Sequence, residues 1–222
     1  MNIVLIGMRG TGKTTVGQLL AQSLKRDFVE TDELITKKSG LPIAEIVEKH
    51  GWEYFRDLES QVVQEISTLD NAVISTGGGV VTRKENVHAL KTNGLVILLT
   101  ATIDTMEKRL TGAKRPPLTT QQTIRQEIEE ILKKRKVLYE KASDIRISTD
   151  DQAPQIVAEK IMKLNSQTTV CGVIGNPVNH SLSPIMHNAG YKAKNLNFTY
   201  LAFMVKDLKD AITGIRALGI KG

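Results

Sequence analysis

The chain has 222 residues and a mass of 24.5 kDa, a length that suits one full domain and part of a second. Its 41% hydrophobic and 24% charged residues are ordinary for a folded protein, which excludes a largely disordered or collagen-like chain. The net charge is +6, yet residues 168–222 hold six Lys or Arg against two Asp, without aromatic interleaving or a run of like charge. We therefore expect no nucleic-acid partner and consider small anionic ligands a better match for this charge.

The cysteine content and the apolar runs indicate a cellular compartment. Cys171 is a single cysteine and cannot form an intramolecular disulfide, which fits a reducing environment. Apolar runs such as Leu95–Leu99 are far shorter than the roughly 20 residues that span a bilayer, and the first residues show no signal-peptide pattern. We expect a cytoplasmic protein with no membrane partner.

Up to about residue 165, short β-branched runs alternate with longer helical patterns, which indicates βαβ units and a parallel sheet. Strands are predicted at Asn2–Gly7, Asp27–Asp32, Asn71–Thr76, Leu95–Thr100 and Asp144–Thr149. Helices are predicted at about Lys13–Lys25, Glu53–Leu69, Lys84–Leu90, Ile103–Leu110, Thr123–Lys141 and Pro154–Leu164. The predicted fold class is α/β, with a five-stranded parallel sheet.

A short polar link, residues 165–169, separates this region from a second run of strand and helix patterns. The elements predicted after the link are a strand at Val170–Gly175, a helix at Ser183–Ala193, a strand at Asn197–Phe203 and a helix at Lys206–Leu218. Four elements bury little core and leave open sheet edges. We therefore predict a first domain at 1–165 and an incomplete α/β domain at 166–222.

The segment Gly7–Thr14 reads Gly-Met-Arg-Gly-Thr-Gly-Lys-Thr and matches the GxxxxGK[ST] phosphate-binding loop. It lies between the first strand and the first long helix, where such a loop is expected. Its glycines and backbone amides suit phosphate, Lys13 is expected to reach the β and γ phosphates, and the Thr14 hydroxyl suits Mg²⁺. The residues predicted to bind the nucleotide are Gly10, Thr11, Gly12, Lys13, Thr14 and Thr15.

Carboxylates and an arginine follow at positions where open α/β sheets bind ligands. Glu30 and Asp32 end the second predicted strand, so that one carboxylate suits a metal through water while the other orients an acceptor hydroxyl. The alternative is that both acids only cap a helix over 33–38. Arg56 lies beside aromatic residues that restrict its rotamers, and the alternative there is a solvated helix arginine.

Three further clusters complete the candidate site. Gly77–Gly79 allow close approach of backbone to a ligand, or else form a flexible turn. The basic segment Arg109–Leu118, which contains Arg115, suits a loop that closes over phosphates, or else an ordinary surface loop. Arg135 lies in the basic run 133–136, and the alternative for it is a solvated helix face.

Together these motifs resemble the shikimate kinase family over residues 1 to about 165, through the P-loop, acid-x-Asp, Phe-Arg-x-x-Glu, Gly-Gly-Gly and Arg-Pro-x-Leu. The resemblance implies a three-layer P-loop kinase fold with ATP and Mg²⁺ as cofactors and shikimate as substrate. It implies that Arg56 and Arg135 bind the shikimate carboxylate and Asp32 the ring hydroxyls. The other implied roles are shikimate binding for Gly77, Gly78 and Gly79, phosphate contact for Arg115, adenine contact for Arg109, and a metal site at Thr14 and Glu30.

Two positions depart from the family pattern. Glu30 stands where an aspartate is usual near Mg²⁺, and Pro117 stands where leucine is common. Glu30 keeps the charge but reshapes the surroundings of the metal, and Pro117 stiffens the loop. Neither departure removes a catalytic charge.

A second resemblance covers the tail. The segment Gly172–Pro184, followed by Met186-His187-Asn188, resembles the start of shikimate dehydrogenase. In that family the two serines, here Ser181 and Ser183, bind the shikimate carboxylate; the alternative is that they only cap the following helix. The catalytic lysine segment and the NADP-binding fingerprint of that family are not among these residues. We therefore expect a kinase fused to an incomplete dehydrogenase, seen as a fragment or truncated product, without dehydrogenase activity.

The expected reaction is in-line transfer of the ATP γ-phosphoryl to the 3-hydroxyl of shikimate. Lys13, Arg115 and Mg²⁺ would balance the charge on the phosphoryl oxygens, while Asp32 holds the hydroxyl and accepts its proton. The alternatives are a related gluconate-type kinase and a nucleotide-binding scaffold without transfer activity. The kinase part is expected to be monomeric, with association through the incomplete tail left open.

Overall fold

The computed structural model describes residues 1–111, 123–165, 169–194 and 196–220. The chain divides into two compact units, Met1–Ile161 and Met162–Gly222, which are described separately. The division falls inside helix α7 (Pro154–Asn165). The limits of the two domains at residue 165 therefore stay a prediction.

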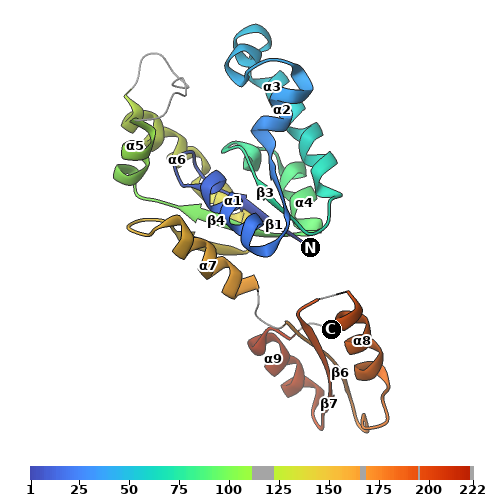
Figure 1. Ribbon diagram of the computed structural model, residues 1–222. Helices are drawn as coiled ribbons and strands as arrows, with labels where there is room; N and C mark the ends of the chain where they lie inside the picture. The colour runs from blue at the N-terminus through green and yellow to red at the C-terminus, as the bar shows by residue number, and fades with distance from the viewer. Residues whose placement is uncertain (112–122, 166–168, 195, 221–222) are drawn as a thin grey trace. The chain divides into compact units, whose positions relative to one another are not determined.

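Unit 1 (Met1–Ile161) is built on one parallel sheet, as predicted (Figure 1). Its strands follow the spatial order β2-β3-β1-β4-β5, and every neighbouring pair is parallel. Their bounds are β1 Asn2–Ile6, β2 Asp27–Glu30, β3 Ala72–Ser75, β4 Gly94–Thr100 and β5 Ile145–Ser148. Because β1 is central and all carboxyl ends lie at one edge, the loop that follows β1 is placed in the middle of that edge.

Helices connect the strands and cover the sheet. Their bounds in unit 1 are α1 Lys13–Leu24, α2 Thr31–Ser39, α3 Ile43–Ser67, α4 Lys84–Thr92, α5 Ile103–Thr111 and α6 Ile124–Ala142, with α7 last and a short 3₁₀ turn η1 at Val80–Thr82. None of the helices in the described part of the chain is long and apolar enough to cross a membrane.

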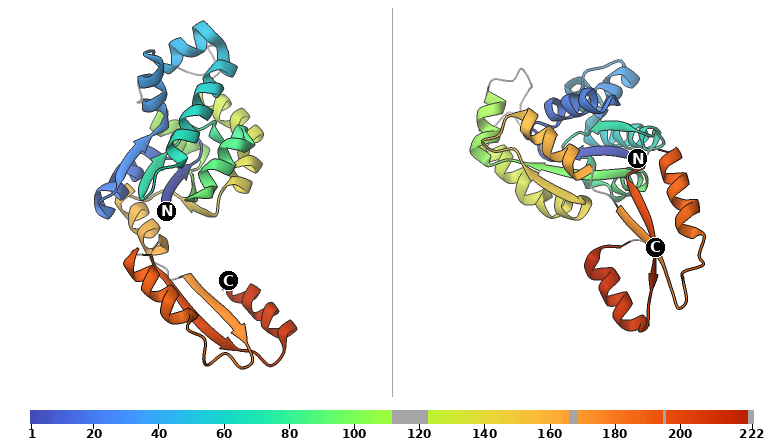
Figure 2. Two further views of the ribbon diagram at one scale, coloured as in Figure 1. Left: turned by 90° about the vertical axis from the view of Figure 1, so that its right-hand side faces the viewer. Right: turned by 60° about the horizontal axis from the view of Figure 1, so that its bottom comes forward.

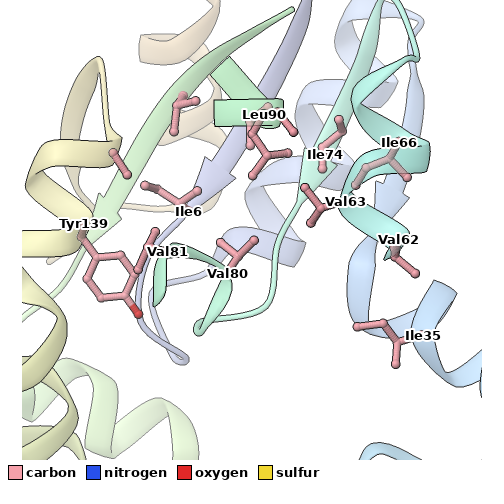
Figure 3. Packing of buried hydrophobic residues seen from close by; sticks show 14 of the residues in the cluster. Ile6, Ile35, Val62, Val63, Ile66, Ile74, Val80, Val81, Leu90 and Tyr139 are labelled. Atoms are coloured by element: carbon pink, nitrogen blue, oxygen red, sulfur yellow. The ribbon is translucent and has the colours of Figure 1, made fainter. Parts of the chain in front are cut away.

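The core of unit 1 lies on both faces of the sheet because side chains alternate along each strand. Val4 and Ile6 face a cluster that includes residues of α3, α4 and α6 (Figure 3). Ile3 and Leu5 are fully buried and point to the opposite face, where α1 contacts the strands. Burial of each such side chain contributes about 1.5–3 kcal/mol, so these strand residues stabilise the sheet that supports the site.

The largest local differences from the predicted elements lie between β2 and β3. Strand β2 ends at Glu30 rather than Asp32, because Thr31 begins α2 and its hydroxyl accepts a hydrogen bond from the Gly77 backbone N–H at 2.9 Å. Thr31 and Asp32 thus belong to helix α2, which the sequence suggested only over 33–38 and only as the alternative for the two acids. Helix α3 also begins ten residues before the predicted start, and Gly51, with φ 82°, interrupts it. Its second half begins after this kink.

Unit 2 (Met162–Gly222) contains the predicted strands and helices of the tail (Figure 2). Its strands β6 (Thr169–Gly175) and β7 (Phe198–Met204) are parallel and form a two-stranded sheet. Helices α8 (Ser183–Ala193) and α9 (Leu208–Leu218) contain no buried residue. The unit therefore has the thin core that the sequence predicted.

Candidate active site

A single cavity of about 1830 Å³ at the carboxyl edge of the sheet contains the predicted site residues that the structure describes in unit 1. Those residues are Gly10, Thr11, Gly12, Lys13, Thr14, Thr15, Glu30, Asp32, Arg56, Gly77, Gly78, Gly79, Arg109 and Arg135. Arg115 and Pro117 lie outside the described residues. A volume well above the roughly 300–1,000 Å³ of a typical ligand pocket leaves room for a nucleotide and an acceptor together.

The loop after β1 has the geometry of a phosphate cradle. Gly7 adopts φ 141°, and a Cβ there would lie 2.3 Å from the Leu99 carbonyl oxygen, so only glycine fits. Gly12 adopts φ 85° and immediately precedes α1. The glycine-rich loop therefore leads directly into the N-terminus of α1, where the helix dipole favours an anion.

Lys13 and Thr14 lie at the centre of this loop. The Lys13 ammonium donates to the carbonyl oxygens of Gly7 and Met8, both at 3.0 Å, and the residue is only 9% exposed. The Thr14 hydroxyl donates to Glu30 Oε1 at 2.6 Å. Glu30 thus contacts the P-loop directly. Its side chain is longer than that of the aspartate that is usual at this position in the family.

Arg109 joins the P-loop to the end of β5. Its guanidinium donates to the Gly10 carbonyl at 3.1 Å and to both the hydroxyl and the carbonyl of Thr149, at 2.9 and 2.8 Å. It belongs to helix α5 rather than to the predicted basic loop, most of which lies outside the described residues. The Arg109 side chain therefore flanks the nucleotide end of the cavity.

Arg56 lines the same cavity and extends from helix α3. Its guanidinium lies 4.9 Å from the Phe55 ring centroid and 5.5 Å from that of Trp52, so the neighbouring aromatics do restrict it. It donates to Glu59 Oε2 at 2.6 Å. The side chains of Arg56 and Glu59 are 13% and 0% exposed, which makes this a buried ion pair rather than a solvated arginine.

Burial raises the pKa of Glu59 above its usual value, while the charge and hydrogen bond of Arg56 oppose that rise. Glu59 was not among the predicted site residues, although the Phe-Arg-x-x-Glu spacing contains it. Residues three apart face each other on a helix, so this spacing was the available signal.

The three glycines allow side chains to press against the loop. A Cβ at Gly79 would lie 2.1 Å from an Arg56 nitrogen, and a Cβ at Gly77 would lie 2.8 Å from Asp32 Oδ1. Such distances are too short for any side chain larger than hydrogen. The glycines are therefore needed for the positions of Arg56 and Asp32, beyond any contact with a ligand.

Helix α6 is attached to the same loop through one carbonyl oxygen. Arg135 donates to Gly78 O at 3.1 Å, and the Tyr139 hydroxyl donates to it as well. Burial raises the pKa of Tyr139. Tyr139 was not predicted, but its position four residues after Arg135 places both on one helix face.

The structure also shows a contact that no sequence pattern signalled. Arg9, a variable position of the P-loop motif, lies 3.2 Å from Glu127 Oε1 on α6, and the Glu127 side chain is 2% exposed. The two residues are distant in sequence and carry no spacing signal. They connect the P-loop to the helix that carries Arg135.

The predicted serines of unit 2 lie close together at the start of α8. The Ser183 backbone N–H donates to Ser181 Oγ at 3.3 Å, which is a local contact of the kind that begins a helix. Their predicted carboxylate-binding role stays a prediction.

A five-stranded parallel sheet with a glycine-rich loop and lysine after its central strand, and with a second charged subsite in the same cavity, defines a P-loop kinase. A family model described as shikimate kinase matches residues 9–165. The chain belongs to the shikimate kinase family, whose members are ATP-dependent phosphotransferases. A second model, described as the shikimate dehydrogenase substrate binding domain, matches residues 173–222, so a partial dehydrogenase domain follows the kinase domain.

Individual relatives agree with this assignment. The chain is 46% identical over 162 residues to shikimate kinase of Thermodesulfovibrio yellowstonii, which covers 73% of this chain and 93% of that protein. It is 43% identical over 162 residues to shikimate kinase of Caldanaerobacter subterraneus, covering 73% of this chain and 94% of that one. Shikimate kinase from Acinetobacter baumannii in complex with shikimate superimposes with a TM-score of 0.71 at 36% identity, covering 73% of this chain and 91% of that chain.

Proposed function

We propose that unit 1 transfers the γ-phosphoryl group of ATP to the 3-hydroxyl of shikimate. The observation that carries this proposal is one cavity whose lining includes both the P-loop with Lys13 and the charged side chains of Asp32, Arg56 and Arg135. The similar Acinetobacter protein was solved with shikimate bound, which supports an acid of that shape beside these charged side chains.

The charged residues of the cavity have separate roles in this transfer. The hydroxyl oxygen forms a bond to the γ-phosphorus while the bond from that phosphorus to the β–γ bridging oxygen breaks, and ADP leaves. Lys13 balances charge on the transferring group, and Asp32 orients the hydroxyl and accepts its proton. Arg56 and Arg135 hold the shikimate carboxylate by charge-assisted hydrogen bonds, which fixes the ring for in-line attack. Arg115 is proposed to contact the phosphates on the family resemblance alone.

The residues near the P-loop fit a magnesium ion. Mg²⁺ is usually held by one or two protein oxygens together with substrate phosphates and water. Thr14 Oγ1 and Glu30 provide such oxygens, and the described residues contain no group of three or more His, Cys, Asp or Glu that would form a full protein cage. Thr14 and Glu30 would hold the ion, which when bound neutralises phosphate charge.

The two alternatives are a gluconate-type kinase, which has another substrate, and a nucleotide-binding scaffold, which phosphorylates none. A gluconate-type kinase has no need for Arg56 and Arg135 on either side of a glycine loop, yet here a buried carboxylate anchors Arg56 and α6 brings Arg135 to Gly78. A scaffold that only binds nucleotide has no need for an acceptor subsite, yet the cavity is also lined by Asp32, Arg56 and Arg135. Both features favour a working kinase for a carboxylated acceptor.

The test is release of ADP from Mg²⁺-ATP with shikimate, with gluconate and with no acceptor, followed by NMR of the product to locate the phosphate. We expect turnover that depends on shikimate, with phosphate on the 3-oxygen. Equal turnover with gluconate would favour the related kinase, and no acceptor-dependent turnover would favour the scaffold.

A further inference from the structure

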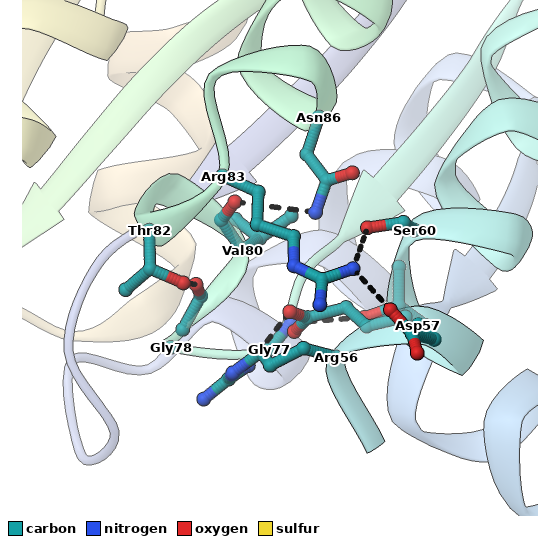
Figure 4. Close-up of polar contacts among 12 residues, drawn as sticks. Arg56, Asp57, Ser60, Gly77, Gly78, Val80, Thr82, Arg83 and Asn86 are labelled. Atoms are coloured by element: carbon teal, nitrogen blue, oxygen red, sulfur yellow. Dashed lines mark hydrogen bonds and ion pairs between the residues drawn. The ribbon is translucent and has the colours of Figure 1, made fainter. Parts of the chain in front are cut away.

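Arg83, which follows the 3₁₀ turn η1, reaches three residues on one face of helix α3, of which Figure 4 shows Asp57 and Ser60. Its guanidinium lies 2.7 Å from Asp57 Oδ1, 3.2 Å from Ser60 Oγ and 3.2 Å from Glu53 Oε2. These partners are spaced four and three residues apart, so they form one stripe along the helix. One arginine side chain thus spans about two turns of α3.

The backbone that carries Arg83 is closely tied to the glycine loop. The Thr82 hydroxyl donates to the Gly79 carbonyl at 2.7 Å, and the Val80 N–H donates to the Gly77 carbonyl at 3.2 Å. The side-chain amide of buried Asn86 donates to the Val80 carbonyl at 3.5 Å. These bonds hold Arg83 at a fixed position relative to Gly77–Gly79.

Helix α3 carries Arg56, whose place against this same loop leaves little tolerance. The Arg56 guanidinium packs closely on Gly79, since a single added carbon there would lie 2.1 Å from it. A displacement of α3 relative to the glycine loop therefore changes where that guanidinium lies. The kink at Gly51 separates the first half of α3 from the second, and Glu53 is in the first turn after it. Arg83 therefore contacts the second half of the helix from its kinked end onward.

We propose that Arg83 is a positioning residue that sets the second half of α3 on the glycine loop and thereby aims Arg56 at the carboxylate of the acceptor. The inference rests on the proposed function, since it takes a carboxylated acceptor as the ligand of Arg56. Arg83 contacts Glu53 and Asp57, which are 91% and 61% exposed, so its ion pairs contribute little to overall stability. A displacement of about 1 Å in a substrate-binding group, by contrast, can cost about 100-fold in rate.

The experiment compares shikimate with its methyl ester, which lacks the negative charge that Arg56 binds. In the wild-type protein we expect kcat/KM to favour the acid, and in Arg56→Ala we expect that preference to shrink to the part that Arg135 alone supplies. Arg83→Ala is expected to lower the ratio of acid to ester kcat/KM by about 10- to 100-fold through a higher KM for the acid, with KM for ATP unchanged. Arg83→Lys is expected to restore part of the ratio, because an ammonium cannot fork to all three partners.

Arg125→Ala is the matched control. Arg125 pairs with three carboxylates, Asp104 at 2.7 Å, Glu107 at 3.1 Å and Glu129 at 3.4 Å, but it joins α6 to α5 and is not among the described residues that line the cavity. We expect it to leave the acid-to-ester ratio unchanged. The proposal is overturned if Arg83→Ala keeps the wild-type ratio of acid to ester kcat/KM. It is also overturned if the variant lowers kcat/KM for the acid and for the ester equally, as a general structural defect would.

Three further outcomes are distinguishable. If Arg83→Ala does not fold, the double variant Glu53→Gln/Asp57→Asn removes the carboxylate partners and keeps Arg83. This double variant must then show the same decrease in the ratio of acid to ester kcat/KM. If the wild-type protein phosphorylates neither compound, the proposed function itself is wrong. If the wild-type protein phosphorylates the acid and the ester equally, Arg56 does not bind the carboxylate. The role of Arg83 is then overturned, although the kinase activity is confirmed.

Discussion

The two units of this chain show the same alternation of strand and helix but differ in what they bury. In unit 1, β1 is buried along its whole length and helices pack on the sheet. In unit 2, neither α8 nor α9 has a buried residue, and Ile185 and Leu218 are 70% and 76% exposed. Local sequence pattern is therefore enough to form elements in both units, but a deep core forms only in unit 1.

The comparison shows why the chemistry lies in unit 1. Lys13 and Glu59 are almost fully buried charges, and a buried charge is tolerated only where the surrounding fold supplies partners that hold it in place. In unit 1 such partners are the Gly7 and Met8 carbonyl oxygens after β1 for Lys13, and Arg56 on α3 for Glu59. A two-stranded sheet of marginal stability does not offer that support.

The largest expected effect is on catalysis in unit 1. Lys13→Ala removes an ammonium aimed at the phosphates, and by analogy with other cationic groups in phosphoryl transfer we expect kcat to fall by about 10³-fold or more. Steady-state ADP release with saturating ATP and shikimate measures the loss. Lys192→Ala removes an exposed lysine of α8 in unit 2 and should leave kcat unchanged. Near-normal transfer in Lys13→Ala would exclude the assigned role.

The second prediction concerns stability. Ile74 is fully buried in β3, and Ile74→Ala is expected to lower the free energy of unfolding by about 2–5 kcal/mol through lost burial and a cavity. Ile212 on α9 is 39% exposed, so Ile212→Ala should change the free energy of unfolding by no more than about 0.5 kcal/mol. Urea unfolding followed by circular dichroism compares the two. Equal losses would mean that unit 2 has a core as tight as that of unit 1.

The third prediction uses the pH dependence of Glu59. Its pKa in the folded protein is raised above the ordinary value of 4.5, so folding favours the protonated form. The stabilising contribution of this group is therefore fully present below pH 4.5 and is lost as pH rises through the folded pKa. Relative to Glu59→Gln, the wild-type protein should gain stability as pH falls across that window.

Activity should change in the opposite direction over the same window. Protonation of Glu59 removes the charge that holds Arg56, so KM for shikimate in the wild-type protein should rise as pH falls, more steeply than in Glu59→Gln. Protonation of the substrate affects both proteins alike, so the difference between the profiles isolates Glu59. Parallel KM profiles would show that Glu59 does not hold Arg56 through its charge.

Much of unit 1 could be predicted because its signals are local. The strands follow from β-branched runs, the P-loop from its spacing, and Arg56 and Arg135 from motifs within single helices. The start of α2 could not be predicted, because Thr31 is a good strand residue whose helical position is fixed by a hydrogen bond to Gly77. Long-range contacts such as those of Arg9 with Glu127, and of Arg83 with Asp57, have no counterpart in the local pattern.

The smallest expected effect tests the independence of the two units most directly. In hydrogen exchange, amides of β1 and β4 should be protected up to the global free energy of unfolding, whereas those of β6 and β7 should exchange through local opening. Brief proteolysis that removes residues 169–222 should then leave kcat and KM for both substrates of unit 1 within about twofold, because the cavity is lined only by residues up to Val157 among those the structure describes. A protected β6, together with loss of activity after cleavage, would show instead that unit 2 is a stable part of the kinase. Fast exchange in β6 with full activity after cleavage would establish that the site depends on the core of unit 1 alone.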